Sequence, residues 1–526
     1  MVFSTIIFLL RFLPITLALY YLAPPKLKNT VLFLCSLVFY CWGEVRFFPV
    51  MLALILINYL CGLGLERFEQ NKTARLILLL IALAGSLGML FYFKYANFVL
   101  SSINAIFGTG FAPIQGISVL PLGISFYTFQ TLSYTIDVYR GHVRPQRNLA
   151  TFATFVCLFP QLIAGPIVRY SDIAPELRSR THTLSDAAAG TRRFVLGLAK
   201  KILFANLLGE LVSGFRASQE QSVLYFWLGA AAFTLQIYYD FSGYSDMAIG
   251  LGRILGFHFP ENFRYPYCAG SITEFWRRWH ISLGSWFRDY LYIPLGGNRK
   301  GKVRKYCNLM LTFLASGLWH GAAWTYVIWG GLHGLYQIIG DLLRPVRKKI
   351  VEIFDVRTDC ISFKLTQIAF TFVLTTFAWI FFRADNLGQA CVYISRIATR
   401  VNPWALFNGT LYTMGLEQFE ANVLFFALFI LLLVDLVRYR LGRRVDVFLQ
   451  EQNIWFRWLV CLLLILLVSC MENTVRIMMR HSLYIFSSKE EHEENNERND
   501  KTYGSLSAVC RSCSRDALWG LPPATF

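Results

Sequence analysis

Charged residues are scarce in this chain. Asp, Glu, Lys and Arg make up 16% of its 526 residues, whereas they make up about a quarter of an ordinary soluble domain. Hydrophobic residues make up 55%. Such a chain has more apolar surface than a water-soluble fold would carry, and lipid is the solvent that accepts the excess. The composition therefore argues against an ordinary soluble enzyme and predicts an integral membrane protein.

Paired cysteines and compact metal-ligand spacings are also lacking. The 12 cysteines are scattered, mostly in apolar segments, and only Cys510 and Cys513 are closely spaced. We therefore expect neither a disulfide framework nor a zinc site. The spacing of His280, His320 and His333 does not match the compact patterns of metal or haem ligands, and no Gly-x-Ser-x-Gly turn indicates a serine nucleophile. The expectation is no metal and no tightly bound cofactor.

Acidic residues are fewer than basic ones, 32 against 50. Much of the basic excess lies in short clusters, at 140–147, 192–201, 299–305, 344–349 and 438–444. Short basic loops are typical of the cytoplasmic side of membrane proteins. Nucleic-acid binding would need this charge on a soluble face with stacking aromatics, and no such domain is visible. Membrane lipids are therefore expected as partners, and nucleic acid is not.

Long hydrophobic runs are what the chain has in abundance. Residues 76–90, 368–382, 423–437 and 456–469 approach the about 20 apolar residues that cross a bilayer. With shorter candidates included, we expect roughly 11–13 transmembrane or re-entrant helices. The predicted fold is all-α, a polytopic protein that crosses the cell (inner or cytoplasmic) membrane several times.

The distribution of hydrophobic and polar residues along the chain predicts four parts. Residues 1–120 are closely spaced transmembrane helices, 121–340 form a core with embedded polar motifs, and 341–470 are again transmembrane helices. Residues 471–526 break the pattern, because 489–501 is dense in Glu, Asn and Lys, like a solvated, disordered tail. Chemistry is expected in the core.

Ionisable side chains at membrane depth are unfavourable unless they face a cavity, pair with one another or carry function. Asp240 and Asp246 lie in one probable helix, and at about 100° per residue they point away from each other. A paired acid and base is therefore not expected. One carboxylate could serve a substrate cavity, and an interhelical ion pair is the structural alternative for either.

Two histidines are the candidates for proton transfer. His280 follows Trp276 in a Trp- and Arg-rich segment, most of which interfacial anchoring explains. His320 lies between Trp319 and Gly321 in an apolar run. Desolvation favours the neutral imidazole, which can accept a proton. A satisfied structural histidine remains the alternative for His320.

Five motifs together resemble a known family. They are PLGISFYTFQ at 121–130, FPQLIAGPI at 159–167, the segment 240–246 with PENF at 260–263, the segment 275–298, and LWHG at 318–321. Their order and spacing resemble the membrane-bound O-acyltransferase (MBOAT) superfamily, specifically its bacterial branch of alginate and peptidoglycan O-acetylation proteins. The resemblance covers residues 1–468, and the D-alanyl transfer protein of teichoic acid synthesis is a more distant relative.

The resemblance implies roles for the candidates. His320 falls on the family's essential histidine, and His280 falls on its second active-site position. Helices are expected around a central tunnel, in which Trp276 and Trp319 exclude water that would hydrolyse an acyl thioester, and Asp240 could contact substrate. The implied donor is acetyl-CoA or another acyl thioester from the cytoplasm.

The implied reaction is O-acetylation of an exported or cell-wall polysaccharide by an O-acyltransferase (an acetyltransferase). An SGNH or esterase-like extracytoplasmic partner is expected for the final transfer. Two alternatives stay open: D-alanyl transfer to teichoic acids, and a transporter or flippase of a lipid-linked sugar. A transporter often shows two related halves, and none is visible in the sequence.

The ending departs from the family, whose members typically finish with a segment such as FIYFQF. After Met471 the chain reads ENTVRIMMRHSLYIFSS and enters the charged tail. Codons can be chosen for residues 470–488 so that the same nucleotides also encode YGEYGPDYDAAQFIYFQF in a second reading frame. In that frame each codon begins on the last base of a codon of the first frame. A stop codon can follow if Ser488 is encoded by TCT. We therefore expect a frameshift just before Met471, which would make residues 471–526 non-native coding.

Overall fold

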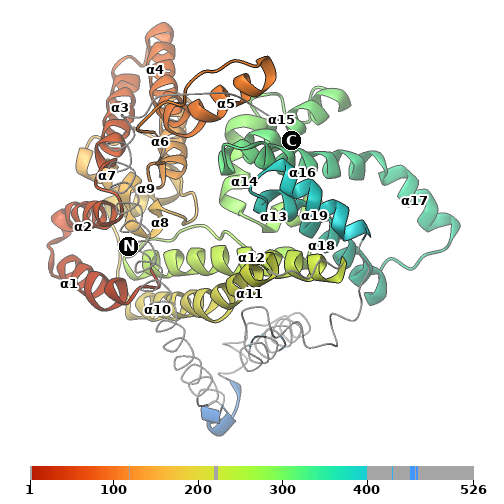
Figure 1. Ribbon diagram of the computed structural model, residues 1–526. Coiled ribbons are helices and arrows are strands. Elements are labelled where there is room, and N and C mark those ends of the chain that lie inside the picture. The colour runs from red at the N-terminus through yellow and green to blue at the C-terminus, as the bar shows by residue number, and fades with distance from the viewer. Residues whose placement is uncertain are drawn as a thin grey trace, which may run out of the picture. The chain divides into compact units, whose positions relative to one another are not determined.

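The computed structural model describes residues 3–117, 119–217 and 223–399, together with 424, 429, 451–456, 458, 459 and 462. Contacts within the chain separate a unit Met1–Phe425 from a unit Phe426–Phe526, and all the predicted site residues belong to the first. Regular structure in the described part is helical throughout, without a strand (Figure 1). The all-α prediction is confirmed. The predicted tail, 471–526, lies outside the described residues.

The N-terminal part of the first unit is a set of apolar helices. Their bounds are η1 Phe8–Phe12, α1 Leu13–Leu22, η2 Pro25–Leu27, α2 Lys28–Gly43, α3 Phe48–Arg67, α4 Lys72–Leu90, η3 Phe91–Tyr95 and α5 Ala96–Phe107. Asn71 starts α4, since its side chain accepts a hydrogen bond from the backbone N–H of Ala74 (3.0 Å). The π-helical turn η3 joins α4 to α5 in one helix of 36 residues.

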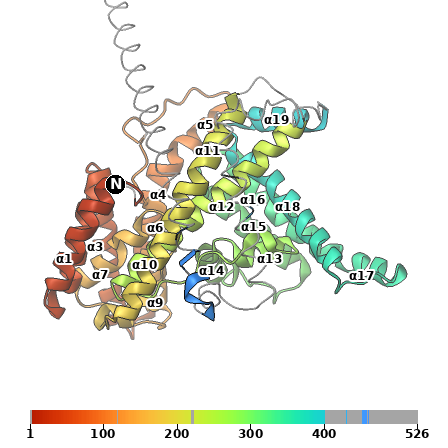
Figure 2. The ribbon, with the colours of Figure 1, turned by 90° about the horizontal axis from the view of Figure 1, so that it is seen from below.

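The middle of the unit is a longer series of helices and short turns. It comprises α6 Ile124–Tyr139, α7 Leu149–Cys157, α8 Phe159–Leu162, α9 Tyr170–Arg178, α10 Leu184–Ala199, η4 Lys200–Asn206, α11 Leu207–Ala217, α12 Val223–Ile254, η5 Pro266–Cys268, α13 Ile272–Arg278, α14 Ile281–Phe287 and η6 Arg288–Tyr292. Glycines allow α10 to lie closely along α12: a Cβ on Gly197 would stand 2.6 Å from the Gly243 carbonyl oxygen. Figure 2 shows α10 and α11 beside α12.

The last helices are α15 Lys302–His320, α16 Trp324–Leu342, α17 Arg344–Ile353, α18 Ile361–Arg383 and α19 Leu387–Thr399. The hairpin of α15 and α16 also packs through glycines. A Cβ on Gly317 would overlap the Tyr326 carbonyl, and a Cβ on Gly330 would overlap the Phe313 carbonyl. This close approach fixes the end of α15 against the start of α16.

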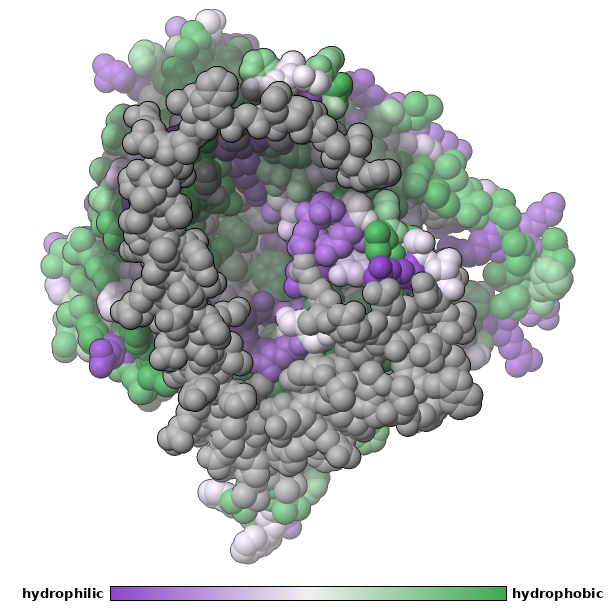
Figure 3. Space-filling view, in the orientation of Figure 1, coloured by the Kyte–Doolittle hydropathy of each residue, from purple (hydrophilic) through white to green (hydrophobic). Residues whose placement is uncertain are grey.

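Three of the described helices are long and apolar enough to cross a membrane: Phe48–Arg67, Lys72–Phe107 and Ile361–Arg383. Large apolar side chains on them are exposed, including Leu80 at 54% and Phe370 at 66%. In the space-filling view, hydrophobic side chains cover much of the surface that is not grey (Figure 3). These features fit the predicted polytopic membrane protein, and the total of 11–13 helices around a tunnel stays a prediction.

Candidate active site

His320 is the last residue of α15, in a cage of aromatic rings. Its imidazole lies with ring centroids 5.0 Å from Trp319, 5.0 Å from Trp329 and 5.5 Å from Phe382. The residue is partly accessible, but its Nε2 atom is buried and has no hydrogen-bond partner among the described residues. An imidazole held this way can receive a proton from a reactant that enters the cage.

The end of α15 is held by two residues of the turn η3. The Lys94 ammonium donates hydrogen bonds to the Trp319 carbonyl and to Ser125 Oγ (2.9 Å), and the Tyr95 hydroxyl donates to the Leu318 carbonyl (2.8 Å). Carbonyls in the last turn of a helix lack intrahelical partners, and a cation there also complements the helix dipole. These two residues therefore position the turn that carries the histidine.

Gly321 follows the histidine because a side chain would not fit there. A Cβ on Gly321 would overlap the Tyr326 ring. Its backbone is extended, with φ −162°, so the requirement concerns space and not backbone conformation. The Tyr326 ring in turn packs edge-on against Phe382, at 4.9 Å between centroids. The glycine thus lets α16 and α18 close around the aromatic cage.

His280 stands at the start of α14 in a left-handed backbone conformation, with φ 44°. It is 1% exposed, and its Nδ1 lies 3.0 Å from Asn262 Oδ1. The same oxygen accepts hydrogen bonds from the Ser282 hydroxyl and N–H, while Asn262 Nδ2 donates to Ser245 on α12. Because the amide oxygen of Asn262 can only accept a hydrogen bond, Nδ1 of His280 must donate it, and the proton of the neutral imidazole is therefore on Nδ1. Nε2 is left as the acceptor, buried and without a described partner.

The structure brings the two predicted histidines together. Their ring centroids are 6.4 Å apart, and Trp319 packs against both, at 5.0 Å from His320 and 6.0 Å from His280. Among the residues described, no group of three or more His, Cys, Asp and Glu side chains could hold a metal ion. The arrangement offers two imidazoles in an aromatic enclosure, each with a buried Nε2 that has no partner among the described residues.

The two carboxylates of the 240–246 segment pair with cations of the neighbouring helix. Asp240 forms an ion pair with Lys201, and Asp246 pairs with Lys200 at 2.6 Å and with Arg193 at 2.9 Å. The residue of this segment that packs on His280 is Phe241, at 4.7 Å. The interhelical role is thus visible for both aspartates, and substrate contact by Asp240 stays a prediction.

Trp276 occupies the far side of the cage. Its ring lies 5.8 Å from Trp329 and 5.0 Å from His333. His333 is fully buried, with neither ring nitrogen bonded to a described residue. Trp319 therefore lies directly against the histidine pair, whereas Trp276 reaches His320 through Trp329.

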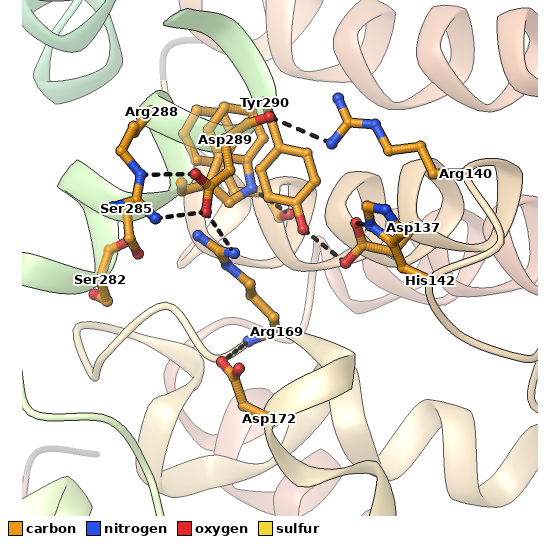
Figure 4. Close-up of polar contacts among 12 residues, drawn as sticks. Asp137, Arg140, His142, Arg169, Asp172, Ser282, Ser285, Arg288, Asp289 and Tyr290 are labelled. Atoms are coloured by element: carbon orange, nitrogen blue, oxygen red, sulfur yellow. Dashed lines mark hydrogen bonds and ion pairs between the residues drawn. The ribbon is translucent and has the colours of Figure 1, made fainter. Parts of the chain in front are cut away.

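A cluster of charged residues ties down the turn η6, which continues from α14 (Figure 4). Asp289 pairs with Arg169 at 2.8 Å and with Arg288 at 2.7 Å, and the Tyr290 hydroxyl donates to Asp137 at 2.7 Å. These contacts join η6 to α6 and to the segment before α9. These contacts therefore hold the end of the helical segment α14–η6, which begins directly after His280.

Sequence reasoning missed Lys94, Tyr95, Asn262 and Phe382 as site residues. Asn262 lies in the motif PENF at 260–263, which is one of the motifs that carry the family resemblance. Lys94 interrupts an apolar run, FYFKY, and an ionisable residue in such a run is itself a signal. Phe382 carries no signal, because any large apolar residue of a membrane helix looks alike in sequence.

Comparison with known proteins gives the class. Residues 140–382 match the family model described as MBOAT, membrane-bound O-acyltransferase family. The probable alginate O-acetylase AlgI of Pseudomonas putida is 47% identical over 392 residues, which cover 74% of this chain and 79% of that protein. The peptidoglycan O-acetyltransferase of Helicobacter pylori is 34% identical, over 74% of this chain and 78% of that protein.

A teichoic acid D-alanyltransferase of Streptococcus thermophilus is more distant, at 28% identity over 44% of this chain and 59% of that protein. The apolar helices are those of a membrane protein, and the candidate residues His280 and His320 lie close together among its helices. The chain belongs to the membrane-bound O-acyltransferase family, and it is an O-acyltransferase. Its activity requires an acyl donor and an acceptor.

Proposed function

We propose that the chain moves acetyl from a cytoplasmic thioester, acetyl-CoA, toward an exported or cell-wall polysaccharide, with His320 as the essential base. The observation that carries this proposal is the pair of facing histidines, each with a buried Nε2 that lacks a described partner. The two relatives at 47% and 34% identity, named for acetylation of alginate and peptidoglycan, support acetyl and a polysaccharide.

The transfer step balances with one base. His320 Nε2 takes the proton of the acceptor hydroxyl as its oxygen attacks the thioester carbonyl carbon. The carbon–sulfur bond then breaks, and the thiolate leaves with the proton that the imidazolium returns. The same sequence applies whether the first acceptor is the sugar or an intermediate carrier of acetyl.

The surrounding residues have supporting roles in this proposal. His280, oriented by Asn262, offers a second acceptor nitrogen beside the reacting hydroxyl. Trp319 and Trp276 line the tunnel and keep water from the thioester. Asp240 would line the substrate path while it remains paired with Lys201.

We place the protein in the cytoplasmic membrane as a multi-pass protein, with the donor on the cytoplasmic side. An extracytoplasmic SGNH or esterase-like partner would carry out the final transfer in an alginate-type system. We also propose that the chain has four parts. Residues 1–120 and 341–470 form transmembrane helices, 121–340 form the catalytic core, and 471–526 form an atypical tail.

The test is acetate released by mild base from the polysaccharide of cells that carry either the wild-type chain or His320→Ala. We expect the acetate to fall to the level of a gene deletion in the variant. His142→Ala is the matched control, because its side chain is 64% exposed and outside the cage. Normal acetylation by a correctly inserted His320→Ala protein would refute the role of the histidine, and normal acetylation after deletion of the gene would refute the function.

D-alanyl transfer remains the second candidate, since D-alanyltransferases belong to the same wider set of relatives. The same base treatment releases D-alanine from its esters. Loss of D-alanine with unchanged acetate on deletion would favour that donor over acetyl. A flippase would instead change the amount of exported glycan and leave its acetyl content per sugar unchanged.

A further inference from the structure

The helix α17, Arg344–Ile353, carries no buried residue. Both ribbon views show it projecting outward from the helices around α16 (Figures 1 and 2). Its 10 residues are fewer than the about 12–15 at which an isolated helix becomes even marginally stable in water. Its sequence RPVRKKIVEI also holds valines and isoleucines, which favour a helix less than unbranched residues do. A surface other than the described protein is therefore needed to stabilise this helix.

One stripe along α17 is apolar and exposed. Val346, Ile350 and Ile353 recur at spacings of four and three residues, which places them on one face of the helix. They are 52%, 48% and 65% exposed, and Phe354, the next residue along the chain, is 71% exposed. Val351 lies off this stripe and is partly buried. The helix thus presents an apolar face that the described residues do not cover.

The other faces of α17 are basic, with four exposed cations: Arg344, Arg347, Lys348 and Lys349. Among them, Lys348 forms an ion pair with Glu352, at 3.7 Å. At about 100° per residue, Arg347 and Lys349 flank the apolar stripe, and the other two cations lie opposite to it. Long basic side chains can keep their stems on an apolar surface while their charged ends reach phosphate groups. An apolar stripe between basic flanks is therefore the pattern of a helix that lies in a membrane surface.

The place of α17 in the chain puts it at one boundary of the membrane. It follows α16 and precedes α18, which is long and apolar enough to cross a bilayer. The basic start of α15, KVRK, lies at the same end, because Lys305 pairs there with Asp341 of α16 at 2.7 Å. By the positive-inside rule, this end is cytoplasmic. The cytoplasmic leaflet is negatively charged and attracts basic segments beside a span, so its charge complements that of α17.

We propose that α17 is an interfacial helix that binds the surface of an anionic lipid leaflet. Its apolar stripe enters the boundary between headgroups and acyl chains, and its basic flanks meet lipid phosphate groups. The helix joins α16, whose Trp329 packs on His320, to α18, whose Phe382 packs on the same ring. Lipid therefore holds the connection between two helices of the aromatic cage. This anchoring is independent of the acyl group and the acceptor of the proposed function.

Hydrogen exchange of the full-length protein in nanodiscs tests the role of charge. The backbone amides of α17 should exchange at least about tenfold more slowly in phosphatidylglycerol than in phosphatidylcholine, because each basic residue at an anionic surface strengthens binding about fivefold. A triple variant that removes three cations of the helix should lose this difference: Arg347→Gln, Lys348→Gln and Lys349→Gln. The matched control removes three exposed cations at the start of α15 and just before it, and it should keep the difference: Arg299→Gln, Lys300→Gln and Lys302→Gln.

A photoreactive side chain identifies what covers the apolar stripe. We expect p-benzoylphenylalanine in place of Ile350 to cross-link to lipid in phosphatidylglycerol nanodiscs, with the adduct detected by mass spectrometry of the α17 peptide. The same photoreactive residue in place of Glu352 is the control, because that position points about 160° away from the stripe. It should give several-fold less lipid adduct. Both substitutions leave the four basic residues in place and alter only exposed positions.

Several results would overturn the proposal. Equal exchange of α17 in the two lipids would show that the helix does not read lipid charge, and loss of the difference in the control variant as well would assign it to the net charge of the protein. A cross-link from position 350 to a second copy of the chain would show that a protein interface covers the stripe. Equal lipid adducts at positions 350 and 352 would show that the helix has no lipid-facing side. Neither experiment measures acetyl transfer, so failure of the proposed function would leave this proposal standing, and the reverse also holds.

Discussion

Replacement of Lys94 by methionine gives the sharpest test of how the cage is built. The change keeps the length and the membrane compatibility of the side chain but removes the ammonium that bonds the Trp319 carbonyl and Ser125. A hydrogen bond from a charged donor is worth about 1.5–3 kcal/mol. Loss of the bonds also leaves a buried carbonyl unsatisfied one residue before His320.

The expected effect falls on the rate and not on donor binding. A displacement of about 1 Å at a reacting group can lower a rate by about 100-fold, so Lys94→Met should lower kcat by about 10- to 100-fold. The KM for acetyl-CoA should stay within about threefold. The assay is acetyl transfer by purified protein in nanodiscs, with equal amounts of folded protein confirmed by size-exclusion chromatography.

A matched control separates this positioning role from a general effect of charge. Lys72→Met removes an exposed lysine from the start of the same 36-residue helix and should leave both constants unchanged. Tyr95→Phe removes only the bond to the Leu318 carbonyl, so its loss of kcat should be smaller. If Lys94→Met keeps at least half of the wild-type kcat, the anchoring of α15 does not position the histidine and the reasoning is refuted.

Four further predictions address the rest of the site. Gly321→Ala should lower activity at least about tenfold, because the new Cβ displaces the Tyr326 ring at a cost of about 1–3 kcal/mol; Tyr326→Ala in the same chain should recover part of it in the transfer assay. Asn262→Ala should lower kcat about 10-fold by releasing the ring of His280, and unchanged kinetics would contradict that role. Asp246→Asn should lower the thermal midpoint in detergent, since Lys200 loses its carboxylate partner and Arg193 keeps only Glu261, at a cost of about 1–3 kcal/mol, while the surviving protein keeps its activity. The nucleotide sequence across codons 470–488 should read YGEYGPDYDAAQFIYFQF and a stop in the shifted frame, and any other reading ends the frameshift hypothesis.

Much of the candidate site could be predicted from the sequence, because ionisable residues are unusual in the hydrophobic segments of a membrane protein. A histidine between Trp319 and Gly321 in an apolar run stands out, and His280 stands out in a segment whose tryptophans and arginines are explained by interfacial anchoring. Their proximity could be inferred only through the family resemblance, since 40 residues separate them and α14, η6 and α15 intervene. Local patterns carry no information about which faces of separate helices meet.

The anchors were not predictable for a related reason. Lys94 bonds a carbonyl 225 residues away in the chain, and nothing in the apolar run around it names that partner. The ion pair of Asp240 with Lys201 was foreseen only as one alternative, because a carboxylate in a membrane helix can face either a cavity or a neighbouring helix. That choice depends on how α10 and η4 pack along α12, and therefore on the glycine contacts of the folded chain.

The packing also explains why the motif PLGISFYTFQ accompanies the histidines although it has no candidate base. On α6, Phe129 stacks on Trp286 of α14 at 3.6 Å and contacts Trp319 of α15 at 5.6 Å. Ser125, one turn earlier, receives the bond from Lys94. The two imidazoles lie at the start of α14 and at the end of α15, and α6 packs against both of these helices. Protein interiors are close-packed and transmit small displacements. The packing of Phe129 between Trp286 and Trp319 therefore helps to set the 6.4 Å between the rings of His280 and His320.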